Sequence, residues 1–306
     1  MRPPTMRKRL PSRGGTSPAA RTLMTRMSEG SSVLPDDVAA TSKVASLSPD
    51  HISAMLRRRG FTYMGGNPRE RLVFPQGSTP ETESVLYNLL HKYSFRLFLR
   101  DIIKQKKSFS EGDVGGYSSV ETVRRYVNAL ISIGVLRRHQ RRLSLISPTV
   151  YSFGDTLEWY VAGIFMHEYG CPSQWGIKLR ELQSGGDLDV VALADGRFVY
   201  VEVKSSPPKH IEQNEISAFL DRVIELEPDI AIFIEDTKLR MKDKIVVMFE
   251  NELATRWPHA GLSVSRIRGE LFAIGRRLFI VNSKPDVPSN LGYCLKRVLS
   301  VPLFPL

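Results

Sequence analysis

The feature that most constrains this chain is an Asp-Gly pair, Asp195-Gly196, between two runs rich in β-branched and aromatic residues, 186–192 and 198–204. Such a pair between such runs predicts a β-hairpin with a two-residue turn. In that hairpin Ala194 pairs with Arg197. Asp189 then lies directly opposite Glu202, on the same face of the ribbon.

This register predicts that two carboxylates lie side by side, because side chains directly opposite each other in a sheet are roughly 5 Å apart. Their repulsion destabilises the sheet unless a cation lies between them. Carboxylate ligands without histidine or thiol favour Mg²⁺, with Mn²⁺ as its substitute, over zinc. Lys204 shares the face, and an ammonium there can position a metal-bound water and stabilise charge developing on a phosphate. The alternative is a solvated sheet face with a surface ion pair, which the interleaved hydrophobic residues disfavour.

The order of an acidic residue, a short hairpin and Glu-x-Lys resembles the PD-(D/E)xK nuclease superfamily. Asp189 stands at the Asp position, Glu202-Val203-Lys204 is the Glu-x-Lys, and Leu188 replaces the proline of the motif. The flanking pattern has the same order as that family's core: a helix over 155–168, a strand over 177–182, the hairpin, a helix over 209–226 and a strand over 229–234. The resemblance implies an α/β (α+β) restriction-endonuclease-like αβββαβ core with a mixed sheet.

The resemblance also implies roles for individual residues. A Glu on the first helix often adds a metal ligand in this family, and Glu158 matches that position. The implied Mg²⁺ ligands are therefore Asp189, Glu202, Glu158 and the Val203 carbonyl. Lys204 would orient the attacking water, and the product would carry a 5′-phosphate. Gln213 matches a supporting Gln found near the start of the second helix in some branches.

Three of these residues have ordinary alternatives. Glu158 fits a capping box that begins at Asp155. Gln213 is expected more often as an exposed helix residue than as part of the site. Asp187 either joins the metal site or pairs with Lys204, and the pairing is favoured.

Charge is distributed unevenly along the chain, whose net charge is +11. Residues 1–28 contain seven Lys and Arg and no acids, and residues 95–147 contain eleven against four acids. Basicity concentrated in a tail and one module favours a polyanionic partner. Residues 1–47 carry Pro, Gly, Ser and Arg without periodicity, which predicts a disordered basic arm.

The basic module begins with helical patterns over 81–93 and 95–106. The sequence Ser118-Ser119-Val120-Glu121 then opens a third helix with a capping box. After Gly134 an apolar, basic, apolar run predicts a two-stranded wing. Residues 95–147 thus resemble a winged helix-turn-helix domain, in which the third helix enters the major groove. The implied DNA contacts are Arg124, Arg125, Asn128, Arg137, Arg138, Arg141 and Arg142. The alternative is a winged helix that docks onto protein.

Three regions follow from these patterns: the arm 1–47, a winged-helix DNA-binding region 48–150 and a nuclease-like domain 151–306. Beyond 235 the sequence indicates a helix over 239–253, strands within 261–281 and a short helix within 285–305.

Cys171 and Cys294 lack zinc spacing, which favours a reducing compartment and a cytoplasmic, nucleoid-associated protein. No apolar run approaches the roughly 20 residues that cross a bilayer. The Arg-rich beginning superficially fits an organelle transit peptide, and Met24 and Met27 are alternative starts to Met1.

The expected function is a metal-dependent endonuclease that hydrolyses DNA delivered by the winged helix. RNA remains open as a substrate, and a homodimer remains open as the assembly. The first rival is a non-catalytic DNA-binding protein that keeps the nuclease fold as a scaffold. The second is an adaptor whose winged helix docks onto a partner.

Overall fold

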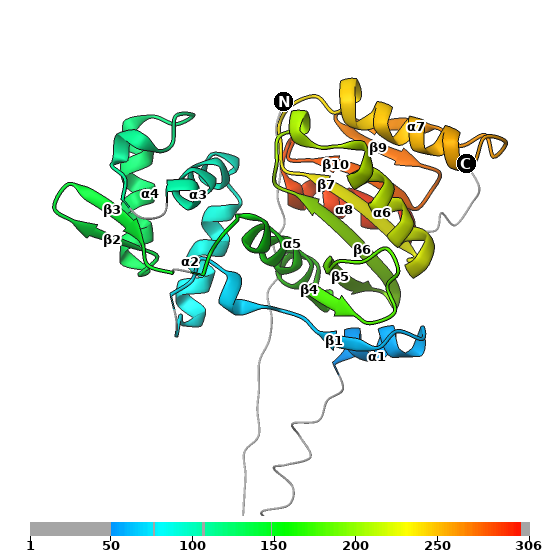
Figure 1. Ribbon diagram of the computed structural model, residues 1–306, viewed down its shortest axis with the longest axis horizontal. Helices are drawn as coiled ribbons and strands as arrows, with labels where there is room; N and C mark the ends of the chain where they lie inside the picture. The colour runs from blue at the N-terminus through cyan, green and yellow to red at the C-terminus, as the bar shows by residue number, and fades with distance from the viewer. Residues whose placement is uncertain (1–49, 76, 106–107, 148, 301–306) are drawn as a thin grey trace, which may run out of the picture. The chain divides into compact units, whose positions relative to one another are not determined.

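The computed structural model describes residues 50–300 apart from 76, 106, 107 and 148, and these residues belong to one packed unit. The expectations for the arm 1–47 and for Met24 and Met27 lie outside this part of the chain. The fold is mixed α/β. Its main feature is a large mixed sheet with strand order β1-β4-β5-β6-β7-β10-β9-β8, and β2 and β3 form a separate hairpin (Figure 1).

The sheet has its parallel pairings at the centre. The strands are β1 (Tyr63–Gly65), β4 (Ser173–Leu179), β5 (Leu188–Ala194), β6 (Arg197–Lys204), β7 (Ile230–Glu235), β8 (Val264–Arg268), β9 (Leu271–Ile274) and β10 (Leu278–Asn282). β7 runs parallel to both β6 and β10, whereas the remaining pairs are antiparallel. Every residue of β7 is buried, as expected for a central strand that reads as a continuous apolar run.

Helices cover both faces of the sheet. α5 (Gly154–Tyr169) and α8 (Val287–Leu299) pack on one face, and α6 (Gln213–Leu226) and α7 (Val247–Arg256) pack on the other. A turn of π-helix, Lys242–Val246, leads into α7. α5 ends at Gly170, whose φ of 62° places it in the left-handed region that glycine adopts without strain. The order from α5 to β7 is the expected αβββαβ.

Residues 51–65 pack with the large sheet rather than with the helices that follow them. α1 (His51–Arg58) buries Ile52, Met55 and Leu56 against the sheet face that α6 covers. β1 pairs antiparallel with β4 and extends the sheet by one edge strand. These residues fall inside the range 48–150 that the sequence assigned to the upstream region. Their apolar residues are too few to form a core of their own.

The rest of the upstream region is helical and ends in the β2–β3 hairpin. It contains α2 (Pro80–Leu90), α3 (Tyr93–Gln105), a 3₁₀ turn at Glu111–Asp113, α4 (Val120–Ser132), β2 (Leu136–His139) and β3 (Arg142–Leu145). We call residues 80–145 the helical module. The predicted capping box at the start of α4 is wrong by one residue, because Ser119 is the N-cap and accepts from the Thr122 amide.

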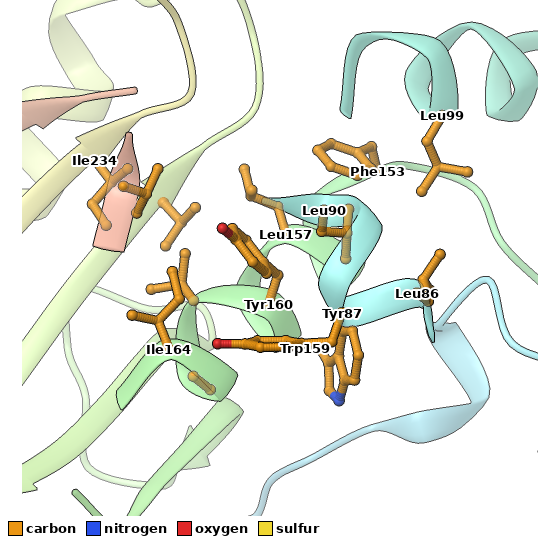
Figure 2. Close-up of a cluster of buried hydrophobic side chains, with 14 of the residues drawn as sticks. Leu86, Tyr87, Leu90, Leu99, Phe153, Leu157, Trp159, Tyr160, Ile164 and Ile234 are labelled. Atoms are coloured by element: carbon orange, nitrogen blue, oxygen red, sulfur yellow. The ribbon is translucent and has the colours of Figure 1, made fainter. Parts of the chain in front are cut away.

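The helical module and the sheet share one hydrophobic core. Leu90 and Leu99 from α2 and α3 belong to the same cluster of buried side chains as Leu157 from α5 and Ile234 from β7. Figure 2 shows these residues on either side of Tyr160. The module therefore packs against the sheet through α5 and is not joined to it only by a linker.

Candidate active site

The hairpin has the register that its Asp-Gly turn predicts. Ala194 pairs with Arg197, and the ladder runs back to Val190 opposite Val201. Asp195 and Gly196 have φ values of 48° and 74°, which is the pair of left-handed residues that a type I′ turn requires. Asp189 and Glu202 are therefore the next residues beyond the last pair of the β5–β6 ladder, at the end away from the turn. Asp189 does not simply face Glu202, because its Oδ2 accepts a hydrogen bond from the Val203 amide at 2.7 Å.

Glu202 is buried, and its carboxylate is surrounded by donors of this chain. Its Oε1 accepts from Arg222 at 2.9 Å and from Lys204 at 3.0 Å, and its Oε2 accepts from the Tyr200 hydroxyl. Arg222 also donates to Tyr200 at 2.8 Å. The charge of Glu202 is thus compensated within the protein.

Arg222 and Tyr200 were not identified from the sequence. One signal was present for Arg222, because it lies three residues after Phe219 and four before Leu226, on the apolar face of α6. A charged residue on a buried stripe needs a partner of opposite charge. Tyr200 gave no comparable signal, since an aromatic residue in a strand is ordinary.

Lys204 lies at the end of β6 with its ammonium between two carboxylates. Its Nζ is 3.0 Å from Glu202 Oε1 and 3.3 Å from Glu215 Oε1. Burial alone would lower the pKa of Lys204, but the neighbouring carboxylates raise it, so the side chain is a cation. The ammonium is held in place and charged, as a group acting on a phosphate needs to be.

The expected pairing of Asp187 with Lys204 is wrong. Asp187 pairs instead with Arg71 at 3.4 Å and with Lys178 at 3.8 Å. The reason is that β5 begins at Leu188 and its ladder with β6 stops at Val190, so Asp187 has no partner position on β6. Arg71 also reaches Asp155 at 3.6 Å.

Glu158 projects from α5 toward the hairpin. The capping alternative is wrong, because α5 begins at Gly154 and its N-cap, Phe153, makes no side-chain cap bond. Burial, followed by the charge of Asp189, raises the pKa of Glu158 to about 10. Glu158 lies beside β4, where a Cβ on Gly176 would be 4.0 Å from its Oε2, an ordinary contact; the same Cβ would be only 2.8 Å from the Pro68 ring, so it is Pro68 that needs a glycine there.

Glu158 on α5 and Asp189 on β5 are half-buried carboxylates that interact electrostatically. Burial, followed by the charge of Glu202, also raises the pKa of Asp189 well above its usual range. Within the described part of the chain neither residue forms an ion pair, whereas Glu202 forms two. Such a pair is stable only if it shares a proton or a cation. Both groups offer carboxylate oxygens, which are the ligands that hard divalent cations prefer.

The donor set is smaller than the sequence predicted. Among residues 50–300, with the gaps given above, no group of three or more His, Cys, Asp or Glu side chains is placed to hold a metal ion. The chemistry of Glu158 and Asp189 fits Mg²⁺ or Mn²⁺. Glu202, as it lies, is occupied by Arg222, Lys204 and Tyr200. The expected ligand role of the Val203 carbonyl remains a prediction.

Gln213 binds α7 rather than these carboxylates. Its Nε2 donates to the Met248 carbonyl and to Glu252, at 2.9 Å in both cases, so that it joins α6 to α7. The side chain is half-buried. It is neither the exposed residue that was expected nor a visible support for the hairpin carboxylates.

The predicted nucleic-acid contacts lie on the surface of the helical module. All seven side chains are exposed: Arg124, Arg125, Asn128, Arg137, Arg138, Arg141 and Arg142. Acidic residues of the 3₁₀ turn engage three of them. Glu111 lies 2.7 Å from Arg138 and 3.8 Å from Arg124, and Asp113 lies 3.5 Å from Arg142. Among the described residues, Arg137 and Arg141 have no ion-pair partner.

Comparisons with known proteins place the chain in no family. No protein-family model and no curated protein matches it. Among solved structures it is similar to protein VC1899 from Vibrio cholerae, with 15% identity and a TM-score of 0.42, over 73% of this chain and 56% of that one. It is also similar to Can2 from Sulfobacillus thermosulfidooxidans, solved in complex with cyclic tetra-adenylate, with 13% identity and a TM-score of 0.46, over 82% of this chain and 61% of that one.

The chain thus spans less than two thirds of the length of either protein. Likenesses this distant carry no conclusion about function, which has to be inferred from the geometry above. No helix in the described part of the chain is long and apolar enough to cross a membrane.

Proposed function

We propose that the chain is a metal-dependent nuclease that hydrolyses phosphodiester bonds in DNA. The observation that most supports this function is the placement of Glu158 and Asp189, two half-buried carboxylates without an ion-pair partner among the described residues, beside the hairpin that ends in Lys204. Two half-buried carboxylates that interact share either a proton or a cation, and this proposal assigns a divalent cation to them. The resemblance of Asp189, Glu202 and Lys204 to the PD-(D/E)xK motif supports the same reaction.

Each residue has a distinct role in this proposal. Glu158 and Asp189 hold Mg²⁺, which when bound supplies positive charge that stabilises the phosphate as it is attacked. Lys204 orients the attacking water through its ammonium, whose direction is set by Glu202 and Glu215. Arg222 and Tyr200 fix Glu202, so that the lysine has a rigid partner. Glu202 joins the metal only if its bonds to Arg222 and Tyr200 are exchanged.

The helical module supplies nucleic-acid binding in this proposal. α4 with its preceding helix and the β2–β3 hairpin have the element order of a winged helix, and their arginines are exposed. Phosphate contacts of this kind give affinity that falls with salt and carry no sequence information. RNA is a variant of the same proposal.

The test is cleavage of labelled duplex, single-stranded and branched DNA, and of RNA, in Mg²⁺, Mn²⁺ or EDTA. We expect cutting that EDTA abolishes. Lys204→Ala, Asp189→Asn and Glu158→Gln should each reduce the rate by about 100-fold or more, because the first removes the cation that orients the attacking water and the other two weaken binding of the metal. Glu181→Gln is the matched control, since Glu181 is an exposed carboxylate that accepts from the Thr62 amide outside the proposed site.

A second candidate is a nucleic-acid-binding protein without catalysis. It is favoured by the commitment of Glu202 to Arg222 and Tyr200, and by the absence, within the described residues, of three metal donors in one group. Tight, salt-dependent binding with no cutting of any substrate in either metal would support it and overturn the nuclease proposal.

A further inference from the structure

Two arginines of α3 reach the end of β7 and bind one buried carboxylate. Arg96 Nε donates to Asp236 Oδ1 at 2.9 Å, and Arg100 Nη2 donates to Asp236 Oδ2 at 2.5 Å. Ser283 donates to the same Oδ1 at 2.6 Å. The Arg96 side chain is 1% exposed and the Asp236 side chain 0%, so this network is shielded from water.

Asp236 is also bonded to the main chain of Lys204. The Asp236 amide donates to the Lys204 carbonyl at 2.8 Å, and Lys204 is in register with Glu235 in the parallel β6–β7 pair. The position of the Lys204 backbone is thus determined by a residue whose side chain is held from α3. Beyond this point β6 and β7 are no longer paired.

Stability alone does not account for such a network. Two arginines and one aspartate in the core cost desolvation free energy, and apolar residues of similar volume often replace such groups without loss. Aromatic rings lie beside both arginines: Arg96 lies over the rings of Tyr93 and Tyr160, and Arg100 over that of Phe153. Burial alone would raise the pKa of Asp236, but Arg96 and Arg100 hold it below its usual value, so the charges persist. What the network provides is a defined position for the strand end.

We propose that Asp236, held by Arg96 and Arg100, is a positioning residue for Lys204, and that α3 of the helical module thereby sets the position of the proposed catalytic lysine. The catalytic effect of this positioning rests on the proposed function, because displacing Lys204 changes a rate only if Lys204 acts on a substrate. It assigns α3 a role in the site that neither the hairpin nor the basic surface requires.

The test compares Asp236→Asn, Arg100→Met and Arg100→Lys with the wild type. We expect kcat to fall about 10- to 100-fold in the first two with KM little changed, because small misplacements of a catalytic group have effects of that size. Arg100→Lys should restore most of kcat, since it keeps a cation beside Asp236. Substitution of Arg100 is expected to destabilise the fold less than Asp236→Asn, because the Arg100 side chain is 12% exposed. The Arg100 variants therefore test the inference if Asp236→Asn does not fold.

A second readout needs no catalysis. The rate at which a limiting acylating reagent modifies Lys204, measured by peptide mass spectrometry against the exposed Lys296, reports how firmly its ammonium is held. We expect that rate to rise several-fold in Asp236→Asn and Arg100→Met. Arg256→Met is the matched control, because Arg256 also binds two carboxylates, Asp221 and Glu252, but between α6 and α7. It should lower stability and leave Lys204 as in the wild type.

The two readouts separate the inference from the function on which it rests. If the wild type cuts nothing but Lys204 becomes more reactive in the variants, the positioning holds and the nuclease proposal fails. If Asp236→Asn and Arg100→Met merely lower the unfolding temperature, with kcat and the reactivity of Lys204 unchanged, the network is structural and the inference is wrong.

Discussion

At the scale of single residues, the buried carboxylates of this protein differ in the cations and hydrogen-bond donors that neutralise their charge. Glu202 has two cations and a hydroxyl, and Asp236 has two arginines and a serine. Glu235, next to Asp236 and 0% exposed, has no hydrogen-bond partner on either oxygen among the described residues. Burial, followed by the charge of Asp236, raises its pKa to about 9. Glu235 is therefore protonated at neutral pH.

This state predicts a pH dependence of stability. The pKa of Glu235 is raised by folding, so above its ordinary pKa of 4.5 the folded protein keeps a proton that the unfolded chain loses. The free energy of unfolding should decrease as pH rises from 6 toward 9. Glu235→Gln should remove about 1.4 kcal/mol of that decrease for each pH unit, measured by urea unfolding at both pH values. Glu181→Gln, at an exposed position, should leave the slope unchanged, and an equal slope in Glu235→Gln would contradict the assignment.

At the scale of elements, the charges of the helical module are partly neutralised before any ligand binds. The acidic 3₁₀ turn lies against α4, β2 and β3, where Glu111 and Asp113 pair with Arg124, Arg138 and Arg142. A phosphate must displace these carboxylates to reach those arginines. Arg141, at the turn of the β2–β3 hairpin, has no such competitor among the described residues.

We expect the arginines to contribute unequally to nucleic-acid binding. Arg141→Ala should weaken binding more than Arg142→Ala, and the slope of log K against log salt should fall by about 0.9 for each phosphate that is no longer bound. Glu111→Gln should strengthen binding, because it releases two arginines. Fluorescence anisotropy of a labelled duplex in EDTA at several salt concentrations measures all three. Equal effects of Arg141→Ala and Arg142→Ala would show that the ion pairs do not matter, and no effect of either would favour protein docking.

At the scale of the whole molecule, the helical module and the sheet are joined by packing as well as by charge. One cluster of buried side chains runs from α4 through α3 and α2 to α5, β7 and α8. Figure 2 shows its part between α3 and β7. Leu99 is fully buried in it. A continuous core couples the stability of its parts, because opening either side exposes apolar surface of the other.

Cooperative unfolding of the described residues follows from this core. Leu99→Ala should lower the free energy of unfolding by about 2–5 kcal/mol. It should accelerate global amide exchange in β6 as much as in α4, although Leu99 belongs to neither. Val120→Ala, at a position 71% exposed, should change little. Exchange that accelerates in α4 alone would mean that the module unfolds independently.

Much of the local structure was predictable because its determinants are close in sequence. The turn Asp195-Gly196 set the register of β5 and β6, and the 3.6-residue spacing of apolar residues located α5 and α6. The ends of elements were misplaced by as much as four residues. The helix expected from 209 begins at Gln213, after a 3₁₀ turn at Pro208–His210, and the strand expected over 177–182 is Ser173–Leu179. At Ser119 neighbouring serines compete for the same cap. β1 was missed because three residues at a sheet edge carry no periodic signal.

The sequence by itself determined the hairpin, the order of the helices and strands, and the presence of Asp189, Glu202 and Lys204 at one end of it. Only the tertiary structure decided which charges meet. Asp187 forms ion pairs with Arg71 and Lys178, Glu202 with Arg222, and Asp236 with two arginines of α3. Hydrogen bonds along a hairpin depend on residues a few positions apart. Ion pairs in a core depend on how distant segments pack, and the free energy of burial then selects the partner.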